Sequence, residues 1–180
     1  MDIRTVRWIL VIAALLGAAL GQAANPPEPA ANPLDAIPEK MPFNTPYGPP
    51  ISLQRAQAAA QTAFAEATKR GWALNIAVVD SGGNLVTFLR MDGAQLASIA
   101  ISEHKARAAV KFRRPTKFFE DAVQKSDYKY TLTLDDVMAS RGGIPLVEDG
   151  KIIGGIGCSG ATSSQDEVVC TAGAVALGKP

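Results

Sequence analysis

The residues best suited to chemistry gather in one segment, SIAISEHKARAAVKFRRPTKFF, which spans residues 98–119. At 100° per residue its apolar side chains form one broad arc of a helix, and most of its charges lie on the opposite arc. Lys105 falls inside the apolar arc. An unpaired buried charge is costly, so this lysine must extend to water, lower its pKa or find an anion. The position indicates either a ligand site or an ion pair with a core carboxylate such as Asp80 or Asp166.

His104 is the only histidine of the chain and lies at the border between the charged and apolar arcs. One histidine cannot form a metal cluster with other histidines, and the chain has no second histidine for a catalytic dyad. It can supply one axial bond to haem iron, where a single protein ligand suffices. The alternative is a boundary residue that hydrogen-bonds to the backbone.

Six cations lie within thirteen residues of this segment: Lys105, Arg107, Lys111, Arg113, Arg114 and Lys117. Carboxylates and phosphates are the natural partners of such a cluster, although nearby carboxylates can also neutralise it as a solvated face. Arg113, Arg114 and Thr116 differ from the rest because they bracket Pro115, which breaks the helix. Their donors can converge there, and the N-terminus of a following helix favours an anion.

A glycine motif of the type GxGxxG is formed by Gly155, Gly157 and Gly160. In dinucleotide-binding proteins this motif follows a strand of a βαβ unit. Here the preceding strand, residues 152–158, is expected to be the second arm of a hairpin that turns at Asp149-Gly150. Only one helix follows the motif. We therefore interpret the glycines as a sharp turn from strand to helix and not as a nucleotide site.

Periodicity and turn signals predict two hairpins flanked by helices. The expected elements are a helix from the cap Ser52 to Gly71, strands 74–79 and 85–89, helices 94–112 and 116–125, strands 145–148 and 152–158, and a closing helix capped by Ser164 with Glu167. This pattern predicts an α+β domain with a mainly antiparallel sheet.

The two cysteines, Cys158 and Cys170, fall on the last strand and the last helix. A bridge between them is open to the chain in an oxidising compartment. Both positions also suit small buried side chains, which is what a free cysteine usually is. The sequence favours two buried thiols.

The N-terminal residues 1–23 resemble a secretory signal, with Arg4 and Arg7 before a short apolar run and small residues at its end. The run is shorter than the roughly 20 residues of a membrane span, although an uncleaved anchor is the alternative. We expect a periplasmic or secreted protein with no stable membrane span after cleavage. The signal's charges sum to +1, so the mature chain has 1 − 1 = 0 formal charge. This neutrality argues against a general nucleic-acid binder.

Residues 24–50 form a Pro-rich arm or linker, and residues 51–180 form one domain. Nine of the twelve prolines lie between residues 25 and 50. Proline fixes φ and lacks a donor, so the segment is expected to be extended. The sequence leaves open whether the arm is free or wraps a neighbouring subunit.

Four motifs together resemble the GlcG/HbpS-like family of haem-binding, haem-degrading-type domains: AVVDSGGNLVTFLRMDGA, ISEHKARAA with RRPTKFF, GGIPL and IIGGIGCSGATSSQDEVV. The resemblance covers nearly all of residues 51–178. It implies a profilin-like layered α+β fold, with an antiparallel sheet between helices, assembled into homo-oligomers. Some relatives bind haem outside the cytoplasm, and others have no settled activity. The two cysteines and the Pro-rich arm depart from the family's pattern.

Three functional classes follow from the residues and the resemblance, and none of them assigns a catalytic residue. The first is an exported haem-binding protein that stores or degrades haem. Its cofactor contacts would be His104, Lys105, Phe112, Arg113, Arg114 and Thr116, with His104 or Thr116 near the iron. The second is a binder or enzyme for a small hydroxy- or keto-acid, which Lys105 and the arginines would clamp. A third class is an oligomeric accessory protein without a ligand.

Overall fold

A computed structural model of the 180-residue chain describes residues 36–178. These residues divide between Lys40 and Met41 into two units, and the second, from Met41 onward, holds every helix and strand considered below. The predicted signal and the first part of the arm lie outside the described residues.

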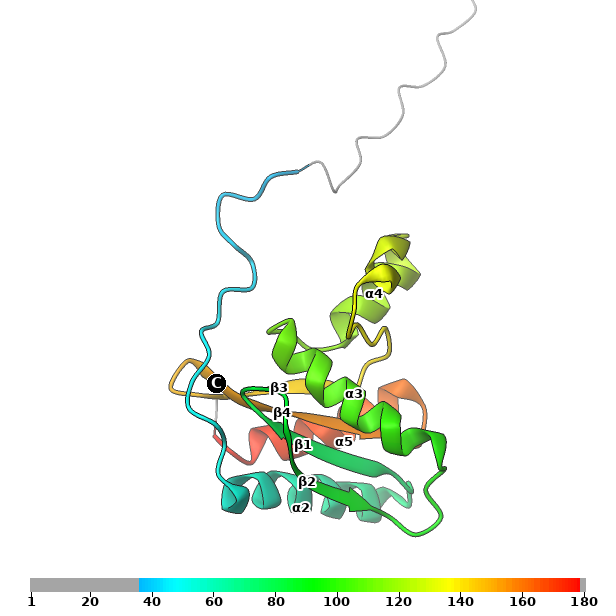
Figure 1. The fold of residues 1–180 in the computed structure, drawn as a ribbon. Helices are drawn as coiled ribbons and strands as arrows, with labels where there is room; N and C mark the ends of the chain where they lie inside the picture. The colour runs from blue at the N-terminus through cyan, green and yellow to red at the C-terminus, as the bar shows by residue number, and fades with distance from the viewer. Residues whose placement is uncertain (1–35, 179–180) are drawn as a thin grey trace, which may run out of the picture. The chain divides into compact units, whose positions relative to one another are not determined.

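The sheet has four strands in the order β2-β1-β4-β3, and every neighbouring pair is antiparallel (Figure 1). In chain order the elements are α2 (Leu53–Arg70), β1 (Asn75–Asp80), β2 (Leu85–Arg90), α3 (Ala97–Lys111), α4 (Lys117–Lys125), the 3-10 turn η2 (Lys129–Thr133), β3 (Gly143–Glu148), β4 (Lys151–Ser159) and α5 (Ser163–Val175). The predicted α+β layered fold and both hairpins are confirmed.

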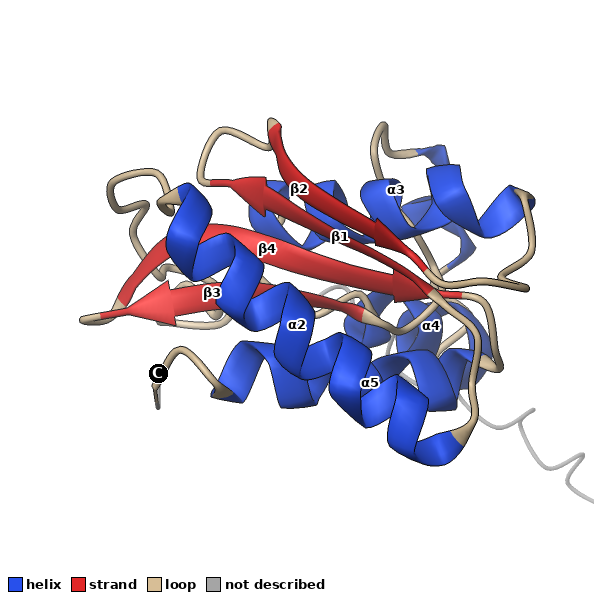
Figure 2. Ribbon diagram, turned by 90° about the horizontal axis from the view of Figure 1, so that it is seen from below, coloured by secondary structure: helices blue, strands red, loops and turns tan. Residues whose placement is uncertain are grey.

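Helices cover both faces of the sheet, with α2 and α5 side by side on one face and α3 on the other (Figure 2). Because successive side chains of a strand point to opposite faces of the sheet, β1 contributes side chains to the apolar packing on both faces. Its Ile76 and Val78 belong to the larger apolar core under α2 and α5, whereas Ala77 and Val79 face α3. On the α3 side, the glycines of β4 let the helix lie close to the strands.

Capping residues determine where the helices begin and end. Ser52 accepts a hydrogen bond from the N–H of Arg55, and Gly71 ends α2 in the left-handed conformation at φ 70°. The predicted capping box of Ser164 with Glu167 is wrong. The box is formed by Thr162 and Gln165, because Thr162 is the last extended residue and Ser164 already lies inside α5.

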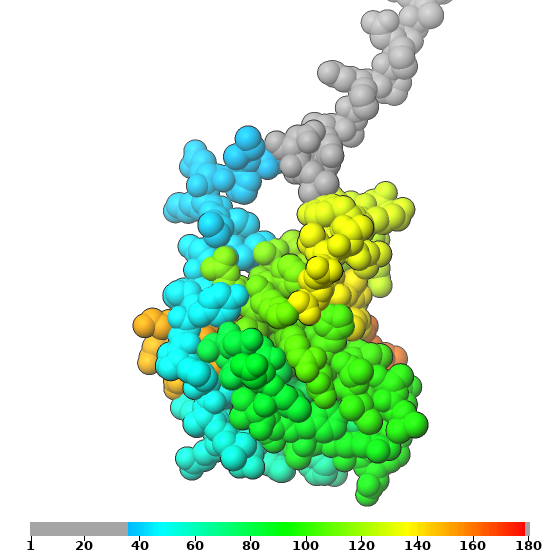
Figure 3. Space-filling view, viewed as in Figure 1, coloured from blue at the N-terminus to red at the C-terminus, as the bar shows by residue number. Residues whose placement is uncertain are grey.

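The last residues of the predicted arm are extended and dock on the domain. The Gly48 N–H donates to the Ile152 carbonyl, and the Ile152 N–H donates to the Pro46 carbonyl, both at 2.8 Å. The pairing of β1 with β4 ends at Gly154, so the arm takes the next place along β4. Figure 3 shows this segment in cyan, lying on the surface of the domain. Residues 46–51 therefore pair with β4 and belong to the same compact unit.

Candidate functional site

Lys105 is buried within an ion pair. Its Nζ donates to Asp166 Oδ2 at 2.8 Å and to the Cys158 carbonyl at 3.1 Å, and the lysine side chain is only 1% exposed. Asp166 lies at the start of α5, on the other face of the sheet from α3. Gly142 leaves room for this contact, since a Cβ there would lie 3.1 Å from Nζ and 2.9 Å from the Cβ of Asp166. Of the two interpretations of Lys105, the structure shows the ion pair.

Burial makes the charged form of Asp166 costly. Burial raises the pKa of the Asp166 carboxyl above its ordinary value, although the Lys105 ammonium and the Ala161 N–H act to lower it. The carboxylate and the ammonium are each costly to bury alone, so the two residues form one structural unit.

Thr116 is also buried and holds α4 to the sheet. Its Oγ1 accepts from the Gly143 N–H at 2.9 Å, and its own N–H donates to the Gly143 carbonyl at 2.9 Å. These bonds support a structural role for Thr116 at the start of β3. Its role as an iron ligand stays a prediction.

Arg114 lies among aromatic rings where α3 gives way to α4. Its guanidinium carbon is 3.2 Å from the ring centre of Phe43 and 4.7 Å from that of Phe118, and its Nε donates to the Phe112 carbonyl. Burial, with the adjacent charge of Arg113, lowers the pKa of Arg114. Among residues 36–178, no ion pair involves Arg113 or Arg114. Within residues 36–178, these two neighbouring cations thus have no carboxylate partner.

The arm lies over this pair of arginines. Arg113 has a positive φ of 54° just past α3, and its guanidinium lies 5.9 Å from the ring centre of Tyr47. The Tyr47 hydroxyl donates to the carbonyls of Val110 and Lys111, which lie in the last turn of α3. The arm thus caps α3 and covers the surface that the sequence singled out.

His104 lies two turns before the end of α3, partly exposed and apart from the arginines. Further along the same helix Lys111 pairs with Asp136, and this hydrogen bond lowers the pKa of Asp136 against the opposing effect of burial. Across residues 36–178, no cluster of three His, Cys, Asp or Glu residues is placed to hold a metal ion. His104 therefore offers a single imidazole.

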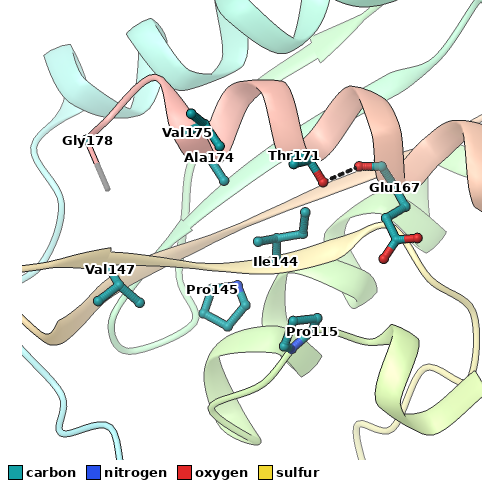
Figure 4. A pocket seen from close by; sticks show the side chains of 9 residues that line it. All are labelled: Pro115, Ile144, Pro145, Val147, Glu167, Thr171, Ala174, Val175 and Gly178. Carbon is teal, nitrogen blue, oxygen red and sulfur yellow. Dashed lines mark hydrogen bonds between the residues drawn. The ribbon is translucent and has the colours of Figure 1, made fainter. Parts of the chain in front are cut away.

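A groove of about 260 Å³ lies elsewhere, between the edge strand β3, α5 and Pro115 (Figure 4). Its lining is formed by Pro115, Ile144, Pro145, Val147, Glu167, Thr171, Ala174, Val175 and Gly178. None of the predicted cofactor contacts lines it. The sequence analysis did not predict this groove, because only the fold brings its three wall segments together: Pro115, residues 144–147 and residues 167–178.

An ionic cluster around Arg141 lies at one end of the groove. The Arg141 Nε and backbone N–H donate to the buried Glu120 at 2.7 and 2.8 Å, and Nη1 lies 3.4 Å from Glu167. Burial acts to raise the pKa of Glu120, but these bonds from Arg141 outweigh it and the pKa is lowered. Arg141 therefore joins α4 to α5, a role that the sequence analysis missed.

The prediction of two free thiols is wrong. Cys158 and Cys170 form a disulfide, with a Cα–Cα separation of 5.6 Å, inside the usual range. Cys158 points from β4 into the core under α5, and Cys170 is on the buried face of α5. The packing of α5 on β4 brings the two sulfurs together. The spacing of the two cysteines in the sequence did not indicate this contact.

The glycines of β4 serve close packing of α3. A Cβ on Gly157 would lie 2.0 Å from the Ser102 carbonyl oxygen, and one on Gly155 would lie 2.6 Å from that of Ala106. Both neighbours of β4 are antiparallel, so the strand is not part of the βαβ unit that a dinucleotide fingerprint requires. The motif lets a helix lie directly on the sheet.

Comparisons with known proteins agree with this architecture. A family model described as "Haem degrading protein HbpS-like" matches residues 51–175, so the chain belongs to this family, as the motifs predicted. Protein GlcG of Escherichia coli K12 is 40% identical over 109 residues, which cover 61% of this chain and 81% of GlcG.

Solved structures of relatives have the same fold. Protein ORFY of Klebsiella pneumoniae superposes with a TM-score of 0.67 at 30% identity, covering 79% of this chain and 97% of ORFY. A PduOC–haem complex superposes with a TM-score of 0.65 at 26% identity, covering 72% of this chain and 96% of PduOC.

Proposed function

We propose that this chain binds haem at the surface where α3 ends and α4 begins. The observation that carries the proposal is the pair Arg113 and Arg114, two adjacent guanidiniums without a carboxylate partner in the described part of the chain. The solved haem complex of PduOC, a relative with the same fold, supports haem as the ligand class. Paired guanidiniums bind carboxylates such as the haem propionates through charge-assisted hydrogen bonds.

The other residues of this surface fit the cofactor. Phe112 and Phe118 supply apolar walls beside the guanidiniums, as cofactor sites require. His104 lies outside this surface, two turns before the end of α3, and stays the candidate for an axial imidazole. Haem, when bound, supplies an iron centre whose reactivity the surrounding groups tune. Lys105 and Thr116 are held in the core, so their part is to position α3 and α4.

The test is a hemin titration followed in the Soret region. We expect a saturable band that shifts in His104→Ala, and an affinity lower by about tenfold to a hundredfold when Arg113 and Arg114 are both changed to Gln. The matched control is Arg70→Gln, since Arg70 also lies over an aromatic ring, that of Trp72 on α2's side of the sheet. A curve without saturation would refute haem binding.

A second measurement, of the Soret band of the haem-bound protein over time, distinguishes haem storage from haem breakdown. A Soret band that persists with a reductant and oxygen supports storage, and a band that decays supports breakdown. The alternative clamp for a small hydroxy- or keto-acid was predicted to use Lys105 and the arginines. Lys105 is paired with Asp166, so only the arginines would be left for that clamp.

We also propose that the protein is exported to an oxidising compartment. The buried Cys158–Cys170 disulfide supports this, because such bonds persist outside the reducing cytosol. In residues 36–178, no helix has the length and apolar character needed to cross a membrane. N-terminal sequencing of protein recovered from an expressing cell tests the proposed cleavage after residue 23. A retained N-terminus would contradict it.

Homo-oligomer formation is part of the proposal as well. Three large apolar side chains near α4 are half exposed: Tyr130, Leu132 and Leu134. Burial of these side chains against a second copy would remove apolar surface from water. Light scattering after size exclusion measures the mass, and a monomer at all concentrations would contradict the assembly.

A further inference from the structure

The groove between β3, α5 and Pro115 lies outside the proposed haem contacts, and one of its ends carries charge (Figure 4). We propose that this groove binds a small organic ammonium, whose apolar body lies against β3 and α5 and whose cationic head pairs with Glu167. The site is independent of haem binding, because it shares no contact residue with the proposed haem surface.

The walls of the groove are apolar and in part uncovered. The side chain of Ile144 lies between β3 and α5, and that of Val175 is 61% exposed. An apolar ligand would therefore remove apolar surface from water. About nine non-hydrogen atoms fit a volume of about 260 Å³, at roughly 30 Å³ each, which corresponds to an ammonium with about six to eight carbons.

Glu167, at one end of the groove, has only a shared and distant cation. Arg141 is its one cationic partner among the ion pairs of residues 36–178, with Nη1 3.4 Å from Oε2. Arg141 forms shorter bonds with the buried Glu120, at 2.7 and 2.8 Å, and lies 3.7 Å from Asp121. Asp121 also pairs with two lysines of α4. Of the three carboxylates around this guanidinium, Glu167 is therefore the least well compensated.

The charge that the groove offers to a ligand is therefore negative. The Glu167 side chain is 27% exposed, so a ligand in the groove can reach its carboxylate. An ammonium carries three donors and forms charge-assisted hydrogen bonds with a carboxylate. The Nε and backbone N–H of Arg141 are already directed to Glu120, so this guanidinium has fewer donors left for an anion.

The free edge of β3 favours a small ligand over an added peptide strand. Gly143 already uses its N–H and its carbonyl in hydrogen bonds with Thr116. Alternate residues of an antiparallel strand direct their backbone groups to the same side, so Pro145 is the next residue that faces away from β4. Proline has no N–H, so this edge cannot form a regular ladder with another strand. The Pro145 carbonyl remains as a second acceptor for an ammonium.

The experiment is a titration with hexylammonium chloride, followed through the NMR chemical shifts of methyl groups. We expect saturable shifts for Ile144 and Val175 in the groove and none for Val86 on β2. Butylammonium should bind more weakly, by about two- to fourfold for each CH₂ removed. Hexanoate has the same length and the opposite charge, and it should not shift these methyl groups.

The variant Glu167→Gln keeps the size of the side chain and removes its charge, while Arg141 keeps its bonds to Glu120. We expect the hexylammonium affinity to fall by about three- to tenfold. The matched control is Glu66→Gln, since Glu66 also pairs with an arginine and its side chain is 20% exposed, but it lies on α2. The control should bind hexylammonium like the unchanged protein.

Three results would overturn the ammonium site. Hexanoate binding as tight as that of hexylammonium, or unchanged binding in Glu167→Gln, would show a groove that recognises apolar surface alone. Shifts that do not saturate would show that the groove binds neither ligand. The hemin titration is a separate measurement, so failure of this site leaves the proposed haem binding intact, and the reverse also holds.

Discussion

The ammonium of Lys105 lies 2.8 Å from the carboxylate of Asp166, and this contact joins α3 to α5 across the edge of the sheet. The two side chains are 1% and 3% exposed. The contact passes beside Gly142, where no side chain intervenes. Lys105, whose position indicated a ligand site or an ion pair, therefore forms an ion pair that connects the two helical layers.

Removal of one partner should destabilise the domain strongly. Lys105→Met leaves the Asp166 carboxylate buried without its cation, and we expect a loss of about 3–5 kcal/mol in the free energy of unfolding. The double variant Lys105→Met with Asp166→Leu should recover much of that loss, because it removes both charges. Urea unfolding measures both. Arg70→Met, which breaks an exposed pair with Glu66, serves as the control and should change little.

Gly157 should not tolerate a side chain. Alanine there would place its Cβ 2.0 Å from the Ser102 carbonyl oxygen, so α3 must move away from β4. We expect a destabilisation of about 1–3 kcal/mol, as for other overpacked cores. Gly82→Ala is the control, because its Cβ meets only the side-chain ends of Asn84 and Asp80. Equal unfolding midpoints for the two variants would contradict the close packing of α3.

Glu120 should make the protein sensitive to acid. Its pKa lies below the ordinary value of 4.5, since the bonds from Arg141 outweigh the effect of burial. The folded state therefore stabilises the charged form. That contribution is fully present above about pH 4.5 and is lost as the pH falls through the lower, folded pKa. In Glu120→Gln the unfolding free energy should fall less steeply below pH 4.5.

The control for that pH series is Asp135→Asn, which removes an exposed carboxylate outside the ion pairs of the described residues. It should keep the steep acid dependence of the unchanged protein. A parallel pH profile for Glu120→Gln and the unchanged protein would rule out the Arg141 cluster as the acid-sensitive element.

The disulfide should contribute substantially to stability. It closes a short loop, with a sequence separation of 12, between β4 and α5. The variant with both Cys158 and Cys170 changed to Ala should lose about 2–4 kcal/mol. Thiol titration of the oxidised protein in denaturant should find no free thiol. Two reactive thiols per chain, or an unchanged urea midpoint in the variant, would contradict this role.

Local sequence signals determined most of the elements. Asp149-Gly150 predicted the second hairpin, because few residues other than Asn, Asp and Gly adopt the positive φ of such a turn. Ser52 and Gly71 predicted both ends of α2. These signals act within a few residues, so they can be read from the chain directly. The motifs likewise predicted the family, which the family model confirms.

Contacts between distant segments were decided by the tertiary structure. The sequence proposed both Asp80 and Asp166 as partners of Lys105, and only the packing of α3 and α5 on one sheet selected Asp166. The disulfide and the placement of the arm over Arg114 arise in the same way. Periodicity shows which face of an element is apolar. It does not show which other face lies against it, because that choice depends on the simultaneous packing of all the layers.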